Sequence, residues 1–148
     1  METISVIVPT QPEGRYFSAC LSSVLKSSYQ NLEVIVIDAG GVDDHAAELM
    51  ETDDRVQVFP HPGQSLAAAW NRGIEVSTGP MIAFLHPKDL SGRMRLELQV
   101  NRLEDYTEPA MSFCGMTFID EDGAFLKGVH LTHAYQGERF LANLYHAN

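Results

Sequence analysis

Hydrophobic residues along the chain alternate between short unbroken runs and spacings of three or four positions. Unbroken runs rich in Val and Ile are typical of buried strands, and the wider spacing is typical of helices with one buried face. The run from Leu32 to Asp38, LEVIVID, is the clearest strand, and its composition indicates a parallel strand covered on both faces. The pattern predicts strands at 4–8, 32–38, 56–59 and 81–85, and helices at 15–27, 43–51, 65–77 and 93–103. In the last of these helices, Met94, Leu96, Leu98 and Val100 are expected to be partly buried.

The C-terminal part of the chain changes to a hairpin pattern. Apolar segments at 110–119 and 124–131 flank the sequence Asp-Glu-Asp-Gly, which predicts a hairpin with Asp120, Glu121 and Asp122 at its tip. A final helix is expected at 136–146. Four strand–helix units followed by a hairpin imply an α/β fold, with a largely parallel sheet between helices.

Length, composition and charge limit the number of domains and the kinds of partner that we expect for this chain. A length of 148 residues predicts a single domain over 1–148, and no apolar run approaches the roughly 18 residues of a membrane span. The net charge of −10, with scattered Lys and Arg, argues against a nucleic-acid partner. Cys20 and Cys114 stand apart among apolar or small neighbours and are interpreted as core residues. Together with a start that lacks a basic leader, they predict a cytoplasmic protein.

Two common nucleotide-binding signatures are absent from the sequence. The segment after the first strand, PTQPEG, has one glycine where a dinucleotide-binding loop has G-x-G-x-x-G, and no G-x-x-x-x-G-K-[ST] occurs. A nucleotide-dependent oxidoreductase is therefore disfavoured.

A set of ordered blocks resembles another family. The blocks are ISVIVPT, CLSSVLKSSYQNLE, VIVIDAGGVDD, HPGQSLAAAWNRGIEVSTGPMIAFL and GRMRLELQV, which together cover about the first 105 residues. In their order and spacing they resemble the family 2 glycosyltransferases, which have the GT-A fold. The resemblance implies a mostly parallel, Rossmann-like sheet and transfer of a sugar from a nucleotide diphosphate donor, such as a UDP-sugar.

The resemblance also implies where the nucleotide sugar binds. By position, the candidate binding residues are Pro9, Thr10, Gln11, Asp38, Gly40, Asn71, His86, Lys88 and Asp89. The sequence departs from the family pattern at one of these residues, Gln11, and at two neighbouring positions. Gln11 replaces an aromatic residue beside the base, Ala39 replaces an acid that reads the uracil ring, and Trp70 replaces an arginine.

The turn from His86 to Asp89 departs most from that pattern. In the family this segment carries acids that meet the ribose and a Mg²⁺ or Mn²⁺ ion, but here Lys88 occupies the metal-binding position. A charged lysine cannot bind a metal and hard cations prefer oxygen ligands, so we expect no metal site, with Asp89 as the one candidate ligand. Two interpretations stay open: either Lys88 supplies the positive charge in a metal-independent site, or the ligand-binding site has been lost.

No catalytic residue can be assigned from the sequence. The family's general base is usually an Asp beside a Glu well past the hairpin, and no such pair follows residue 123. We therefore expect the chain to be the donor-binding half of a larger protein whose acceptor half is absent. The alternative is a non-catalytic GT-A-fold module that serves in interaction or scaffolding.

Overall fold

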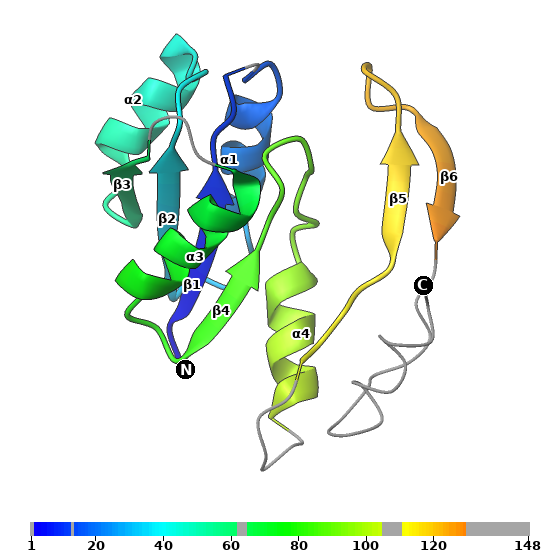
Figure 1. The fold of residues 1–148 in the computed structure, drawn as a ribbon. Coiled ribbons are helices and arrows are strands. Elements are labelled where there is room, and N and C mark those ends of the chain that lie inside the picture. The colour runs from blue at the N-terminus through cyan, green and yellow to red at the C-terminus, as the bar shows by residue number, and fades with distance from the viewer. Residues whose placement is uncertain (1, 13, 62–64, 105–110, 130–148) are drawn as a thin grey trace. The chain divides into compact units, whose positions relative to one another are not determined.

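Four parallel strands form the sheet of the N-terminal part of the chain, in the order β3–β2–β1–β4 (Figure 1). The computed structural model describes residues 2–12, 14–61, 65–104 and 111–129. The strands are β1 (Ile4–Pro9), β2 (Leu32–Asp38), β3 (Val56–Pro60) and β4 (Met81–Phe84). In the register, Ile4 of β1 pairs with Leu32 of β2 on one side and with Met81 of β4 on the other. The predicted strands and their parallel arrangement are confirmed.

Three helices connect these strands, and two of them start at a residue whose side chain caps the helix. They are α1 (Phe17–Leu25), α2 (Asp44–Thr52) and α3 (Leu66–Val76). The side chains of Asp43 and Ser65 cap α2 and α3 by accepting main-chain hydrogen bonds from Ala46 and Ala68. In Figure 1, α3 crosses one face of the sheet and α1 lies behind the other face.

The core of this part lies where the central strands meet α3. Ile7, Ile35 and Ile37 are fully buried and form one cluster with Ala69 of α3. Trp70 packs against this cluster from the same helix and is half-buried. Its ring meets that of Phe84 edge-on at 5.7 Å between centroids.

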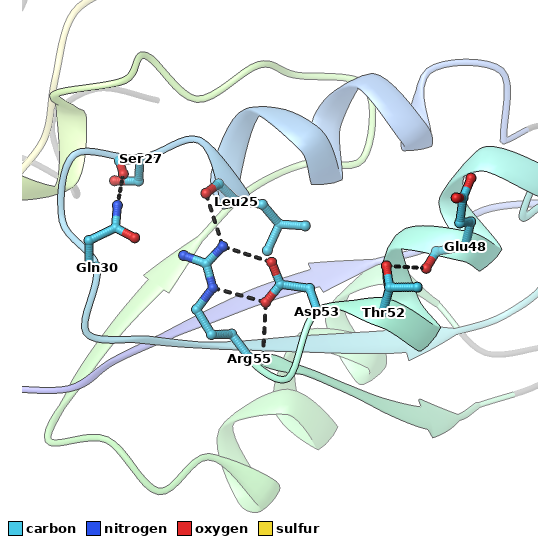
Figure 2. A network of polar contacts seen from close by, with 7 residues as sticks. All are labelled: Leu25, Ser27, Gln30, Glu48, Thr52, Asp53 and Arg55. Atoms are coloured by element: carbon cyan, nitrogen blue, oxygen red, sulfur yellow. Dashed lines mark hydrogen bonds and ion pairs between the residues drawn. The ribbon is translucent and has the colours of Figure 1, made fainter.

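A polar network ties the end of α1 to the turn between α2 and β3 (Figure 2). The guanidinium of Arg55 donates two hydrogen bonds to the Asp53 carboxylate, at 2.9 and 2.8 Å, and a third to the carbonyl O of Leu25 at 3.0 Å. Arg55 therefore links the turn before β3 to the end of α1, which lies 30 residues earlier in the sequence.

The C-terminal part of the chain forms a second unit from Arg95 to Asn148, distinct from the unit Met1–Met94. Its described elements are α4 (Arg95–Leu103), β5 (Met116–Ile119) and β6 (Phe125–Val129), and the two strands are antiparallel. At their turn, Oδ1 of Asp120 accepts hydrogen bonds from the N–H groups of Asp122 and Ala124. The predicted hairpin is confirmed, whereas the helix predicted at 136–146 lies outside the described residues. The single domain over 1–148 stays a prediction.

Two expectations about buried residues are wrong. Met94 and Leu98 were expected to be partly buried, yet they are 54% and 59% exposed, while Leu96 and Val100 are buried. Cys114 is exposed, so only Cys20 is a core cysteine. In the part of the chain that the structure describes, no helix has the length and apolar character needed to cross a membrane.

Candidate functional site

The candidate binding residues gather at the carboxyl edge of the N-terminal sheet. Because β1, β2 and β4 are parallel, their carboxyl ends lie at the same edge, which is where α/β proteins bind ligands. Thr10 follows β1, Asp38 ends β2, and His86 comes two residues after β4. Pro9 is fully buried at the end of β1 and holds Thr10 at this edge.

Thr10 and Asp38 form the centre of the site. The Thr10 hydroxyl donates to Oδ1 of Asp38 at 3.1 Å and accepts from the N–H of Ala39 at 2.8 Å. The same Oδ1 accepts from the N–H of Gly40 at 2.8 Å. Because Thr10 is only 3% exposed, its hydroxyl is a fixed part of this network. The second carboxylate oxygen of Asp38 makes no hydrogen bond to a described residue, so it can accept one from a ligand.

The chain leaves β2 through two glycines in an unusual conformation. Gly40 and Gly41 have φ angles of 97° and 77°, in the region that residues with a Cβ rarely adopt. This conformation lets the Gly40 N–H turn back to the Asp38 carboxylate. The carboxylate is thereby held at the edge of the sheet.

Asp43, the residue that caps the N-terminus of α2, is an acid with a lowered pKa. Oδ1 of Asp43 accepts a hydrogen bond from the N–H of Ala46 at 2.7 Å. This hydrogen bond is the largest cause that lowers the pKa of Asp43, and a hydrogen bond from the Ser18 side chain of α1 lowers it further. Asp43 is exposed, so its charge mainly serves the helix N-terminus.

The turn after β4 is a compact structure anchored on α1. The N–H of Asp89 donates to the carbonyl O of His86 at 2.9 Å, and the N–H of Lys88 donates to Nδ1 of His86 at 3.3 Å. The Cys20 thiol of α1 donates to the same His86 carbonyl at 3.5 Å. Lys88 and Asp89 are exposed and His86 is half-buried. The turn therefore presents one cation and one anion to solvent.

The side chains of two predicted binding residues make no hydrogen bond to the others in the described part of the chain. Gln11 is half-buried beside Thr10, and its carboxamide makes no hydrogen bond to a described residue. Asn71 is exposed on α3 and likewise makes no side-chain hydrogen bond within the described part of the chain.

His61 is a residue of this edge that the sequence pattern did not single out. Its N–H donates to the main-chain O of Asp38 at 2.8 Å, and its Nε2 is buried with no hydrogen-bond partner in the described part of the chain. An unpaired buried nitrogen, on a residue whose main chain bonds Asp38, can serve a ligand. The available signal was its position directly after β3, since parallel strands share their carboxyl edge.

The donor atoms of the 86–89 turn do not fit a divalent cation. The turn offers one carboxylate and one imidazole beside an ammonium group, whereas Mg²⁺ requires several oxygen ligands. Among the residues that the structure describes, no three His, Cys, Asp or Glu side chains lie close enough together to hold a metal ion.

Comparisons with known proteins identify the family. The sequence profile described as "Glycosyl transferase family 2" matches residues 5–144. An uncharacterized glycosyltransferase of Rickettsia bellii is 33% identical over 129 residues, which is 86% of this chain and 19% of that protein. Glycosyltransferase GlyG of Streptococcus pneumoniae is 30% identical over 128 residues, covering 84% of this chain and 42% of that protein. The chain thus spans less than half the length of either relative.

Solved structures share the fold at lower sequence identity. S. aureus TarS 1–349 in complex with UDP-GlcNAc superposes with a TM-score of 0.61 at 19% identity, over 70% of this chain and 31% of that chain. The mannosyltransferase PcManGT from Pyrobaculum calidifontis, in complex with GDP-Man and Mn²⁺, has a TM-score of 0.58 at 21% identity, over 80% of this chain and 35% of that chain.

Proposed function

The chain belongs to glycosyl transferase family 2, and from this premise we propose that the carboxyl edge of its sheet binds the nucleotide diphosphate part of a sugar donor. The observation that carries the proposal is the fixed network of Thr10, Asp38 and Gly40, which leaves one Asp38 oxygen open to a ligand. TarS and PcManGT, which share the fold, were solved with UDP-GlcNAc and with GDP-Man.

The nucleoside would lie against the ends of β1 and β2. The open oxygen of Asp38 accepts an N–H of the base or a hydroxyl of the ribose. Gln11, whose carboxamide can both donate and accept, supplies a second polar contact beside it. His61 offers its buried Nε2 from the end of β3.

The diphosphate would lie toward the 86–89 turn. Glycosyl transfer breaks the bond between the anomeric carbon and the diphosphate oxygen, and negative charge develops on that oxygen. The Lys88 ammonium is a compact positive charge suited to balance it. We propose that this reduces the need for a divalent cation, because the turn lacks the oxygen ligands such an ion requires.

A binding experiment tests this assignment with a matched pair of lysines. The chain is titrated by calorimetry with UDP, GDP, UDP-GlcNAc and GDP-Man, first with Mn²⁺ and then with EDTA. We expect binding of at least one nucleotide that EDTA does not abolish. Lys88→Ala should weaken it about tenfold, which corresponds to about 1.4 kcal/mol. Lys26→Ala should leave it unchanged, because Lys26 is exposed at the far end of α1.

Two results would contradict the proposal. Binding that requires Mn²⁺ and ignores Lys88→Ala would overturn the role of Lys88. The absence of binding to every nucleotide would overturn the donor site and support the alternative of a non-catalytic interaction module. The donor-binding half of a larger enzyme and the cytoplasmic location stay predictions of the sequence.

A further inference from the structure

The loop that follows β1 and the loop that follows β2 approach each other through their main chains. A Cβ added to Gly14 would lie 1.5 Å from the carbonyl O of Gly41. A Cβ added to Gly41 would lie 1.9 Å from the carbonyl O of Gln11. No side chain fits at either position without moving backbone atoms, so this approach depends on both glycines.

Hydrogen bonds hold the same two loops together beside the glycines. Nearer the sheet, the Thr10 hydroxyl donates to Asp38 and accepts from the N–H of Ala39. These hydrogen bonds and the glycine contact form one seam between the loops.

We propose that Gly14 and Gly41 are positioning residues that lock the two loops into one preorganised wall of the donor site. The part of this inference that concerns ligand binding rests on the proposed function. A wall that is already ordered spares the ligand the cost of fixing two loops on binding. A looser seam would let the Thr10 hydroxyl separate from Asp38 and from the Ala39 N–H, and the carboxylate would lose its fixed orientation.

Gly14 gives the cleaner test of the two glycines. Gly41 has a positive φ of 77°, so any replacement there strains the backbone regardless of neighbours. Gly14 has no such φ, and its replacement acts only through the clash with Gly41. Gly92 is the matched control, because an added Cβ there meets nothing within 4 Å and its φ is not in the positive region.

The experiment compares Gly14→Ala with Gly92→Ala by two readouts. The first is amide hydrogen exchange at Ala39 and Gly40 without ligand, which we expect to become about tenfold faster in Gly14→Ala only. The second is the Kd for the nucleotide that the unmodified chain binds, which we expect to rise about tenfold in Gly14→Ala only. Val24→Ala, a core truncation in α1, controls for lowered stability and should change neither readout at temperatures well below its Tm.

The outcomes separate this inference from the proposed function. Equal exchange in Gly14→Ala and Gly92→Ala would overturn the lock. Faster exchange with an unchanged Kd would overturn the positioning role. If the unmodified chain binds no nucleotide, the proposed function fails, and the exchange readout alone decides whether the loops are locked. If Gly14→Ala does not fold, Thr10→Val removes the hydroxyl that bridges the two loops without adding a clash and should speed exchange at Ala39 in the same direction, by about threefold.

Discussion

Glu33 accepts hydrogen bonds from both the N–H and the hydroxyl of Thr78, at 2.6 and 2.8 Å, across 45 residues of sequence. The Ser5 hydroxyl and the N–H of Gly79 donate to the same carboxylate. Glu33 is 7% exposed and lies near the amino end of β2, at the opposite edge of the sheet from the candidate site. It therefore fastens the loop between α3 and β4 to the two central strands.

The first prediction concerns the stability of this contact as a function of pH. Burial raises the pKa of Glu33, but hydrogen bonds from Ser5, Thr78 and Gly79 together outweigh burial, so the pKa lies below its ordinary value. A lowered folded-state pKa gives stability that is present above the unfolded-state value and is lost as the pH falls through the folded value. Glu33→Gln should lower the free energy of unfolding by about 1–3 kcal/mol at pH 7, because its NH₂ group cannot accept these hydrogen bonds.

Denaturant unfolding at several pH values checks this prediction. The difference between the unmodified chain and Glu33→Gln should begin to shrink below pH ~4, where the carboxyl group of the unfolded chain becomes protonated, and should keep shrinking until the pH falls below the folded-state pKa. Glu51→Gln, at an exposed position on α2, should stay within about 0.5 kcal/mol throughout. A difference for Glu33→Gln that does not vary with pH would mean that the charge of Glu33 contributes nothing.

The second prediction compares two arginine–carboxylate pairs. Arg55 and Asp53 form a two-pronged pair whose side chains are 25% and 24% exposed, and the pairing lowers the pKa of Asp53 (Figure 2). Arg72 and Glu75 form a single contact at 45% and 65% exposure. Arg55→Lys should cost about 1 kcal/mol because lysine cannot bridge Asp53 and Leu25 together, while Arg72→Lys should cost less than about 0.5 kcal/mol. If thermal unfolding shows that both variants lose the same stability, the two-pronged geometry of Arg55 does not contribute to stability.

The third prediction concerns Gly73, where helix propensity and packing have opposite effects. Replacing a glycine inside a helix by alanine normally stabilises it by about 0.5–1 kcal/mol. Here the added Cβ would lie 2.3 Å from Cγ2 of Ile7, which is fully buried in β1. Gly73→Ala should therefore destabilise the chain, by about 1–3 kcal/mol.

A double-mutant cycle isolates the contact between Gly73 and Ile7. In the Ile7→Ala background, which removes the clashing methyl group, Gly73→Ala should be close to neutral or stabilising. The same loss of stability in both backgrounds would contradict the contact.

Much of the fold could be predicted because local pattern and tertiary burial agree. The Val and Ile runs of β1 and β2 are buried along their whole length. Such unbroken apolar runs are typical of central parallel strands that are covered on both faces. The prediction was wrong in the helix at 93–103, where residues on too much of the helix surface were expected to be buried. Positions 94 and 98 form one helical stripe and 96 and 100 another, about 200° away, so both stripes cannot face one core. Only Leu96 and Val100 are buried.

The candidate site was predictable to the level of the sheet edge and no further. Thr10 and Asp38 could be placed together because they end neighbouring parallel strands. The approach of Gly14 to Gly41 and the hydrogen bond from His61 to Asp38 join segments more than 20 residues apart. Such contacts depend on loop conformations that no local periodicity encodes, so the sequence pattern does not predict them.

The last prediction concerns the segment that carries the 86–89 turn. Cys20 and Ser23 of α1, together with Ser27 just after the helix, bond this segment at His86, Ser91 and Arg93. Cys20 and Ser23 are three residues apart and therefore lie on the same face of the helix. The central contact is the strongest by distance, with the Ser23 hydroxyl accepting from the N–H of Ser91 at 2.8 Å.

Ser23→Ala should release this segment from its central contact. It leaves the N–H of buried Ser91 without an acceptor, which should cost about 1–3 kcal/mol in the free energy of unfolding. Hydrogen exchange in a peptide covering 86–93 should become faster, because the segment would open locally. Ser22→Ala is the matched control, since Ser22 points about 100° away around the helix. If both variants exchange alike, the Ser23 contact does not hold the turn, and Lys88 owes its position to β4 alone.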